Sequence, residues 1–142
     1  MTGQEELEKI AVLERQIEEQ ELYIQELKEA LSGLGAIRYD KEVVQSSPPS
    51  DPLALKLIKL EEEEEKLQVM KQKYVNHKVH CIDMIHHMDS IDHKKLLYLV
   101  YINGYSLKNA SEKMNYSYDY IRKMHRKALF EIGTVKHSET FA

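Results

Sequence analysis

The sequence predicts an all-α protein in which long coiled-coil helices are followed by a small helix-turn-helix domain. Two long stretches carry apolar residues at a three-four spacing, which is the seam of a coiled coil. Only five glycines and three prolines interrupt the 142 residues, so few helix breaks are expected. Serine residues stand where short helices near the C-terminus need caps. We therefore expect a coiled-coil helix at 1–35, a linker at 36–52, a second long coiled-coil helix at 53–88 and a helix-turn-helix domain at 89–142.

The first predicted helix runs from about Gln4 to Leu31. Gln20 is the polar member of its seam, where it either fixes the register of the pairing or occupies a loosely packed position. So narrow an apolar stripe on a long helix requires a partner helix. We expect the seam to form a homodimer or higher oligomer through Ile10, Leu13, Ile17, Ile24, Leu27 and Leu31.

A linker and a second long helix follow. Glycines stop the first helix near residue 33, and three prolines prevent a continuous helix through residues 32–52. Asp51 fits an N-cap with Pro52 at the first helical position, and the helix then extends to about Met88. This helix can fold back on the first one, or each helix can pair with a second copy of the chain. The sequence leaves both arrangements open.

The last third of the chain is predicted to hold three short helices. The expected elements are a helix over His93–Asn103 ended by Gly104, a helix over Leu107–Met114 capped by Ser106, a turn at Asn115-Tyr116, and a helix from Tyr118 to about Ile132, capped by Ser117 and ended by Gly133. Two short capped helices joined by such a turn form a helix-turn-helix. Ser111 is small enough for the helix crossing. The residues expected to lock the two helices together are Ala110, Met114, Tyr116, Ile121 and Met124.

The outward face of the third helix is predicted to contact double-stranded DNA. In helix-turn-helix units this helix enters the major groove, where Arg pairs with guanine while Lys and Ser contact phosphates. Residues 1–70 hold 8 Lys and Arg against 17 Asp and Glu, whereas residues 93–142 hold 9 against 4, so only the C-terminal end is basic. The alternative is an ordinary solvated helix face. The predicted DNA contacts are Ser117, Tyr118, Asp119, Arg122, Lys123, Arg126 and Lys127.

Two short motifs flank this unit, namely Tyr101-Ile102-Asn103-Gly104 and His125-Arg126-Lys127-Ala128-Leu129. With them, residues 96–132 resemble the region-four helix-turn-helix of bacterial sigma factors. They are more similar still to small sigma-like regulators of phages and integrated elements of Gram-positive bacteria, which also share the Ser50-Asp51-Pro52 start of the second long helix. Val100, Ser111 and Asn115 depart from that pattern, where Arg, Ala and Gly are usual.

The resemblance implies a transcription regulator, an activator of phage or mobile-element genes, and it allows RNA polymerase as a further partner. No segment resembles those with which sigma factors bind the promoter minus-ten element and the polymerase clamp. Two other functions stay open: a phage DNA-packaging or recombination accessory protein that uses the same motif architecturally, and a coiled-coil adaptor that binds RNA polymerase. An enzyme is not expected, because the sequence has no nucleophile elbow, Gly-rich phosphate loop or paired carboxylates.

Several other features are expected to be structural. A metal site is not predicted from the histidine and cysteine residues of the second helix, because they lack a second ligand pair at a recognised spacing. These residues are His77, His80, Cys81, His86 and His87. No cofactor is expected. The run Glu61–Glu65 is expected to be a solvated helix face. Core and turn packing is expected for Tyr98, Tyr101, Tyr105, Tyr116 and Tyr120.

The sequence also predicts a cytoplasmic protein without a membrane segment. No stretch approaches the ~20 apolar residues of a membrane-spanning helix. The N-terminus is acidic and has no apolar region typical of a secretory signal. The single cysteine, Cys81, excludes an internal disulfide and favours a reducing compartment.

Overall fold

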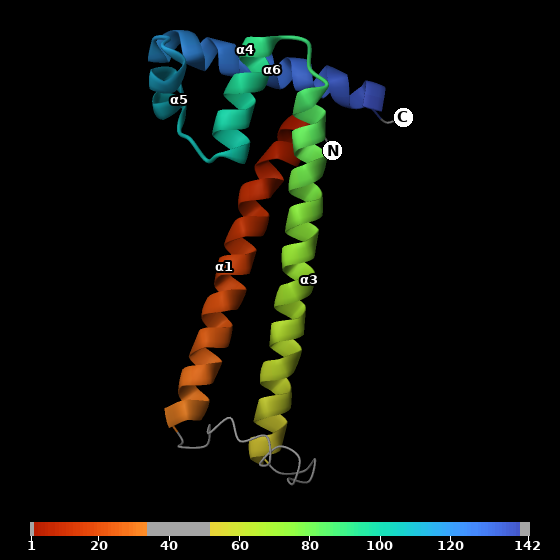
Figure 1. The fold of residues 1–142 in the computed structure, drawn as a ribbon, viewed down its shortest axis with the longest axis vertical. Coiled ribbons are helices and arrows are strands. Elements are labelled where there is room, and N and C mark those ends of the chain that lie inside the picture. Colours follow the sequence, from red (N-terminus) through yellow and green to blue (C-terminus); the bar gives the residue numbers. More distant parts are fainter. Residues whose placement is uncertain (1, 34–51, 140–142) are drawn as a thin grey trace. The chain divides into compact units, whose positions relative to one another are not determined.

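The computed structural model describes residues 2–33 and 52–139, and for residues 134–139 only the backbone. Within these ranges the chain forms helices and no strand, which confirms the all-α class. The elements are α1 (Gly3–Gly33), α3 (Pro52–His86), α4 (Ile91–Leu97), the π-helical segment η1 (Tyr98–Ile102), α5 (Leu107–Met114) and α6 (Tyr118–Glu139), shown in Figure 1. Among the residues that the structure describes, no helix has the length and apolar character needed to cross a membrane.

The chain divides into two compact units. We call the unit formed by Met1–Leu13 and Tyr74–Ala142 the head, and the unit Glu14–Lys73 the arm. Helices α1 and α3 contribute to both units, whereas the three short helical elements and α6 belong to the head alone.

In the arm, α1 and α3 pack side by side within one chain (Figure 1). Their seam buries Ile24, Leu31 and Leu60. The two helices are antiparallel, since an ion pair of 3.5 Å joins Glu21 to Lys71 and one of 3.3 Å joins Lys28 to Glu64. The fold-back arrangement that the sequence left open is therefore the one adopted here. Pairing with a second copy stays a prediction.

Gln20, the polar member of the seam, is hydrogen-bonded across the helix pair. Its Nε2 donates to the backbone oxygen of Glu63 at 3.0 Å and to the Glu63 carboxylate at 2.8 Å. The hydrogen bond from Gln20, followed by that from Lys59, lowers the pKa of Glu63. These contacts favour the register-fixing interpretation of Gln20 over a loosely packed position.

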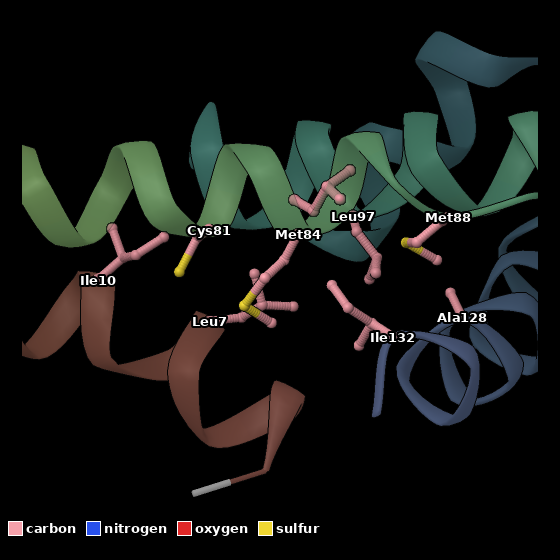
Figure 2. Close-up of a cluster of buried hydrophobic side chains, with 9 residues drawn as sticks. Leu7, Ile10, Cys81, Met84, Met88, Leu97, Ala128 and Ile132 are labelled. Atoms are coloured by element: carbon pink, nitrogen blue, oxygen red, sulfur yellow. The ribbon is translucent and has the colours of Figure 1, made fainter. Parts of the chain in front are cut away.

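The head contains a core to which four helices contribute (Figure 2). Figure 2 shows these side chains converging from α1, α3, α4 and α6 and from the connection between α3 and α4: Leu7, Ile10, Cys81, Met84, Leu97, Ala128 and Ile132 from the helices, and Met88 from the connection. The first turn of α1 lies so close to α6 that a Cβ atom on Gly3 would lie 3.1 Å from the Ile132 backbone. Burial raises the pKa of the Cys81 thiol to about 12, with a smaller contribution from Glu6, so this cysteine is an unreactive core residue.

Helices α5 and α6 begin at the predicted caps. The hydroxyl of Ser106 accepts from the backbone N–H of Asn109 at 3.1 Å, and that of Ser117 accepts from the N–H of Tyr120 at 3.1 Å. Helix α4 begins at Ile91, two residues before the predicted start, because Ser90 caps it through the N–H of His93. The last turn of this segment is π-helical.

One predicted helix end is wrong. Helix α6 does not stop at Gly133 but continues to Glu139. A glycine inside a helix costs only about 1 kcal/mol relative to alanine, and it ends a helix only when the following residues favour another conformation. Gly133 does not adopt a positive φ, unlike Gly104, so the helix passes through it.

Candidate nucleic-acid interface

Helices α5 and α6 are fixed to each other by a second buried cluster. The residues of this cluster are Leu96, Leu99, Ala110, Met114, Ile121 and Met124. Ser111 is also buried, as its small size suggested, and its Oγ donates to the backbone oxygen of Lys108 at 2.6 Å. The last four residues of the cluster are those that the sequence predicted to lock the two helices together.

Tyr116, the fifth predicted locking residue, is not part of the cluster. Its side chain is 37% exposed, and its hydroxyl donates to the carboxylate of Asp92 at 3.0 Å. Its ring lies 4.9 Å from that of Tyr120, which is exposed as well. The helical spacing that identified the other four residues does not extend through the turn, so the prediction fails here. The core prediction is also wrong for the exposed Tyr98.

A residue with a left-handed backbone conformation reverses the direction of the chain between α5 and α6. Asn115 has a φ of 61°, a conformation that asparagine tolerates better than most residues. Its N–H donates to the backbone oxygen of Glu112 at 3.3 Å, and the N–H of Tyr116 donates to that of Ser111 at 3.0 Å. The turn therefore satisfies the last carbonyl groups of α5, and α6 starts directly afterwards at its Ser117 cap.

The predicted DNA-contacting residues share one exposed surface at the start of α6. All seven are exposed: Ser117, Tyr118, Asp119, Arg122, Lys123, Arg126 and Lys127. The guanidinium of Arg122 lies 5.7 Å from the centre of the Tyr118 ring, and Lys123 forms an ion pair of 3.6 Å with Asp119. These contacts are weak at an exposed surface, so the side chains can exchange them for a ligand at little cost.

No known protein family, curated protein or solved structure matches this chain. The resemblance to sigma region four therefore stays a prediction that rests on the residues themselves.

Two polar contacts that the sequence did not predict fix α6 in the head. They are made by residues of α6 that lie outside its exposed surface. The Nδ1 of His93 lies 2.7 Å from a carboxylate oxygen of Glu131, whose other oxygen accepts from the backbone N–H groups of Asp89 and Ser90. Partial burial acts to raise the pKa of Glu131, but these hydrogen bonds outweigh it and lower the pKa. The partners are about forty residues apart in the sequence, so these contacts cannot be predicted from the spacing of nearby residues.

The second of these contacts joins Tyr101 to His125. The Tyr101 hydroxyl lies 2.8 Å from the His125 Nε2, and the two rings stack with their centres 5.8 Å apart. Burial lowers the pKa of His125 and raises that of Tyr101 to about 12, so both rings are neutral near pH 7. Both contacts place α6 by means of residues that are not on its exposed face.

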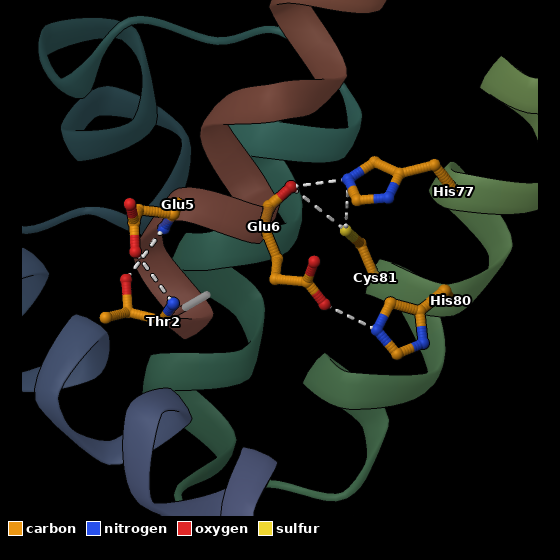
Figure 3. Close-up of polar contacts among 6 residues, drawn as sticks. All are labelled: Thr2, Glu5, Glu6, His77, His80 and Cys81. Carbon is orange, nitrogen blue, oxygen red and sulfur yellow. Dashed lines mark hydrogen bonds and ion pairs between the residues drawn. The ribbon is translucent and has the colours of Figure 1, made fainter.

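Two histidines and the cysteine of α3 have structural contacts in the head (Figure 3). The backbone oxygen of Glu6 accepts from His77 at 2.6 Å and from the Cys81 thiol at 3.4 Å, while the Glu6 carboxylate lies 2.7 Å from His80. These three side chains thus tie the first turns of α1 to α3. In the part of the chain that the structure describes, no three His, Cys, Asp or Glu residues form a group able to hold a metal ion.

Four of the six residues predicted to mediate oligomerisation, Ile10, Ile24, Leu27 and Leu31, pack against partners within the chain. Ile10 lies in the head core beside Cys81 and Met84. In the arm, Ile24 and Leu31 are buried and Leu27 packs against them and α3. The remaining two, Leu13 and Ile17, are half-buried. The seam is thus occupied by α3 of the same chain, and its role in an oligomer stays a prediction.

Proposed function

We propose that the protein is a sequence-specific DNA-binding transcription regulator in which α5, the turn and α6 act as a helix-turn-helix. The observation that carries this proposal is the exposed cationic surface at the start of α6. That surface lies on a helix whose opposite side is fixed by buried Ile121 and Met124. A rigid helix that presents Arg and Lys residues from its first turns fits the recognition helix of such units.

The side chains of this surface suit both parts of DNA recognition. Arg122 and Arg126 are one helical turn apart and can each donate two hydrogen bonds to a guanine. Lys123 and Lys127 follow them at the same spacing and suit phosphate groups. Asp119 can accept a hydrogen bond from cytosine, and it repels phosphates. We assign base reading to Arg122, Arg126 and Asp119.

Ser117 and Tyr118 complete the proposed interface at the beginning of α6. The Tyr118 ring is 47% exposed, and it can contact a thymine methyl group while it supports the Arg122 guanidinium. Ser117 already accepts a hydrogen bond as the cap of α6, and its hydroxyl hydrogen can be donated to a phosphate.

The kind of regulator is proposed from the resemblance alone. It suggests an activator of phage or mobile-element genes that acts in the cytoplasm and binds DNA beside RNA polymerase. The alternatives, a packaging or recombination accessory protein or a coiled-coil adaptor for RNA polymerase, differ from it in what they bind. A regulator selects a few sites next to genes, an architectural protein binds many DNA sequences equally, and an adaptor needs no DNA.

A binding selection tests this proposal. The purified full chain is mixed with sheared DNA of its host and element at ~150 mM salt, and the bound fragments are sequenced. We expect enrichment of a small number of sites upstream of genes, with an affinity that falls steeply as salt rises because several phosphates are contacted. Binding without sequence preference would instead support the architectural alternative.

The double variant Arg122→Ala/Arg126→Ala links that binding to α6. We expect it to weaken binding to the selected site by at least tenfold, since each paired guanine contributes about 1–3 kcal/mol of discrimination. The matched control is Arg15→Ala/Lys66→Ala, which removes two exposed cations from the arm. Equal losses in both variants would mean that overall charge, and not the α6 surface, determines binding.

A further inference from the structure

An apolar groove lies in the head between the end of α3 and the segment α4–η1. Its volume is about 440 Å³, and its walls include Ile82, Ile85, Ile91 and Leu99. Lys94 and Lys95 stand beside these apolar walls. The groove is separate from the proposed DNA interface, because none of the seven residues assigned to DNA contributes to it.

The apolar surface continues beyond the groove. Ile91 is 78% exposed, which is an unusually high exposure for an isoleucine side chain. On α3, Val75 and Val79 are exposed and precede Ile82 at a four-three spacing, so they extend the same helix face. A contiguous exposed apolar face of this kind marks a site for a protein partner. An open groove beside a helix suits an amphipathic helix.

A segment of the arm has the chemistry of such a helix. On α3, Leu55, Ile58, Glu62, Glu65 and Val69 follow a 3-4-3-4 spacing and are all exposed. We call these five residues the outer stripe. At 100° per residue they lie opposite the buried Leu60, on the face of α3 that is turned away from α1. The outer stripe thus consists of exposed apolar side chains with two carboxylates between them.

The carboxylates of the outer stripe are distinct from those used inside the arm. In the run Glu61–Glu65, Glu63 receives hydrogen bonds from Gln20 and Glu64 forms the ion pair with Lys28. Glu62 and Glu65 point away from that helix pair, because they lie on the opposite face of α3. They can therefore meet a cationic partner without loss of the contacts between α1 and α3.

We propose that the groove of one copy of the chain binds the outer stripe of a second copy. Leu55 and Ile58 enter the apolar groove, and Glu62, one helical turn after Ile58, reaches Lys94 or Lys95 together with Glu65. This assignment rests on a match between the two surfaces. The outer stripe has two apolar side chains followed by two carboxylates, and the groove has apolar walls with two lysines beside them. It does not depend on the proposed DNA-binding function.

Charge reversal on each side of this contact tests the proposal. The association of the full-length chain is measured by sedimentation velocity from about 1 to 100 µM at low salt, where ion pairs are least screened. We expect reversible self-association that Lys94→Glu/Lys95→Glu weakens by about tenfold or more, as does Glu62→Lys/Glu65→Lys, because each creates like-charge pairs. An equimolar mixture of the two variants has opposite charges at both pairings between unlike chains, the reversed groove with the reversed stripe and the unchanged groove with the unchanged stripe, and so regains association.

Controls separate this contact from a general effect of charge. Glu18→Lys/Glu26→Lys reverses two exposed carboxylates on α1 and leaves association unchanged. Far-UV circular dichroism confirms that all variants keep their helices. A chain that stays monomeric at 100 µM overturns the proposal, as does self-association that neither charge reversal weakens. A mixture of the two variants that fails to associate overturns it as well.

Discussion

The arm and the head are stabilised in different ways. In the arm a single apolar seam joins two helices, and Gln20 and two ion pairs are among the polar contacts between them. In the head, side chains from every helical element fill two buried clusters, and hydrogen bonds link residues far apart in the sequence. A repeated spacing of apolar residues is thus sufficient to stabilise a helix pair. The stability of an irregular domain such as the head depends instead on individual residues. Single substitutions should therefore cost more in the head than in the arm.

The largest effect is expected from truncation of a fully buried residue between α5 and α6. Ile121→Ala should lower the free energy of unfolding of the head by about 2–5 kcal/mol, because it leaves a cavity in a packed cluster. A smaller cost, about 1 kcal/mol, is expected in the arm from Leu27→Ala, because Leu27 is only partly buried. Urea denaturation followed by circular dichroism measures both. Equal costs would show that the two units do not differ in this way.

The same contrast explains which parts of the fold were predictable. The long helices follow from a spacing that recurs over many turns, so that no single position decides the prediction. Helix α5 has the predicted bounds because Ser106 and Asn115 are local signals, one for a cap and one for a left-handed turn. The end of α6 was not predictable from Gly133, because one glycine disfavours a helix only weakly and here does not adopt a positive φ.

The exposed surface of the candidate site was predictable to the same extent. Helical periodicity and the reversal of charge along the chain identify the exposed surface of α6. Two contacts position α6 through residues outside its exposed surface, namely His93 with Glu131 and Tyr101 with His125. The residues of these pairs are 38 and 24 positions apart in the sequence. Such pairs depend on how helices meet in space, and a single sequence carries no spacing from which to infer them.

A smaller effect, one that depends on pH, is expected at Glu131. Glu131→Gln should lower the free energy of unfolding by about 1 kcal/mol near neutral pH, since it weakens the hydrogen bonds from His93 and from the backbone N–H groups of Asp89 and Ser90 just before α4. The pKa of Glu131 is lowered in the folded protein, so its ionised form stabilises the fold above the unfolded pKa near 4.5. That stability is lost as the pH falls through the folded pKa. Urea denaturation from pH 7 to pH 3 measures it.

The comparison between wild type and Glu131→Gln gives this prediction its control. The two proteins should differ in stability at pH 7 and converge at acidic pH, where the wild-type carboxyl is protonated and also neutral. A difference that stays constant down to pH 3 would mean that the side chain acts by packing and not by charge.

The smallest effect on stability is expected at Gln20 in the arm. Gln20→Leu should change the free energy of unfolding by less than about 1 kcal/mol, because the lost hydrogen bonds are offset by apolar burial. The pKa of Glu63 should nevertheless rise toward its usual value, since the hydrogen bond from Gln20 is the main cause of its lowering. Carbon-detected NMR titration of the Glu63 carboxyl measures this shift, with the exposed Gln16→Leu as the control.

The same variant tests what sets the register of the two arm helices. If Gln20 fixes it, Gln20→Leu should give duplicated or broadened arm resonances while the stability stays nearly constant. If one sharp set persists although the pKa of Glu63 has risen, the register is set by the seam and by the ion pairs of Lys28 with Glu64 and of Glu21 with Lys71. The arm would then depend on no single residue, and its contrast with the head would be sharper.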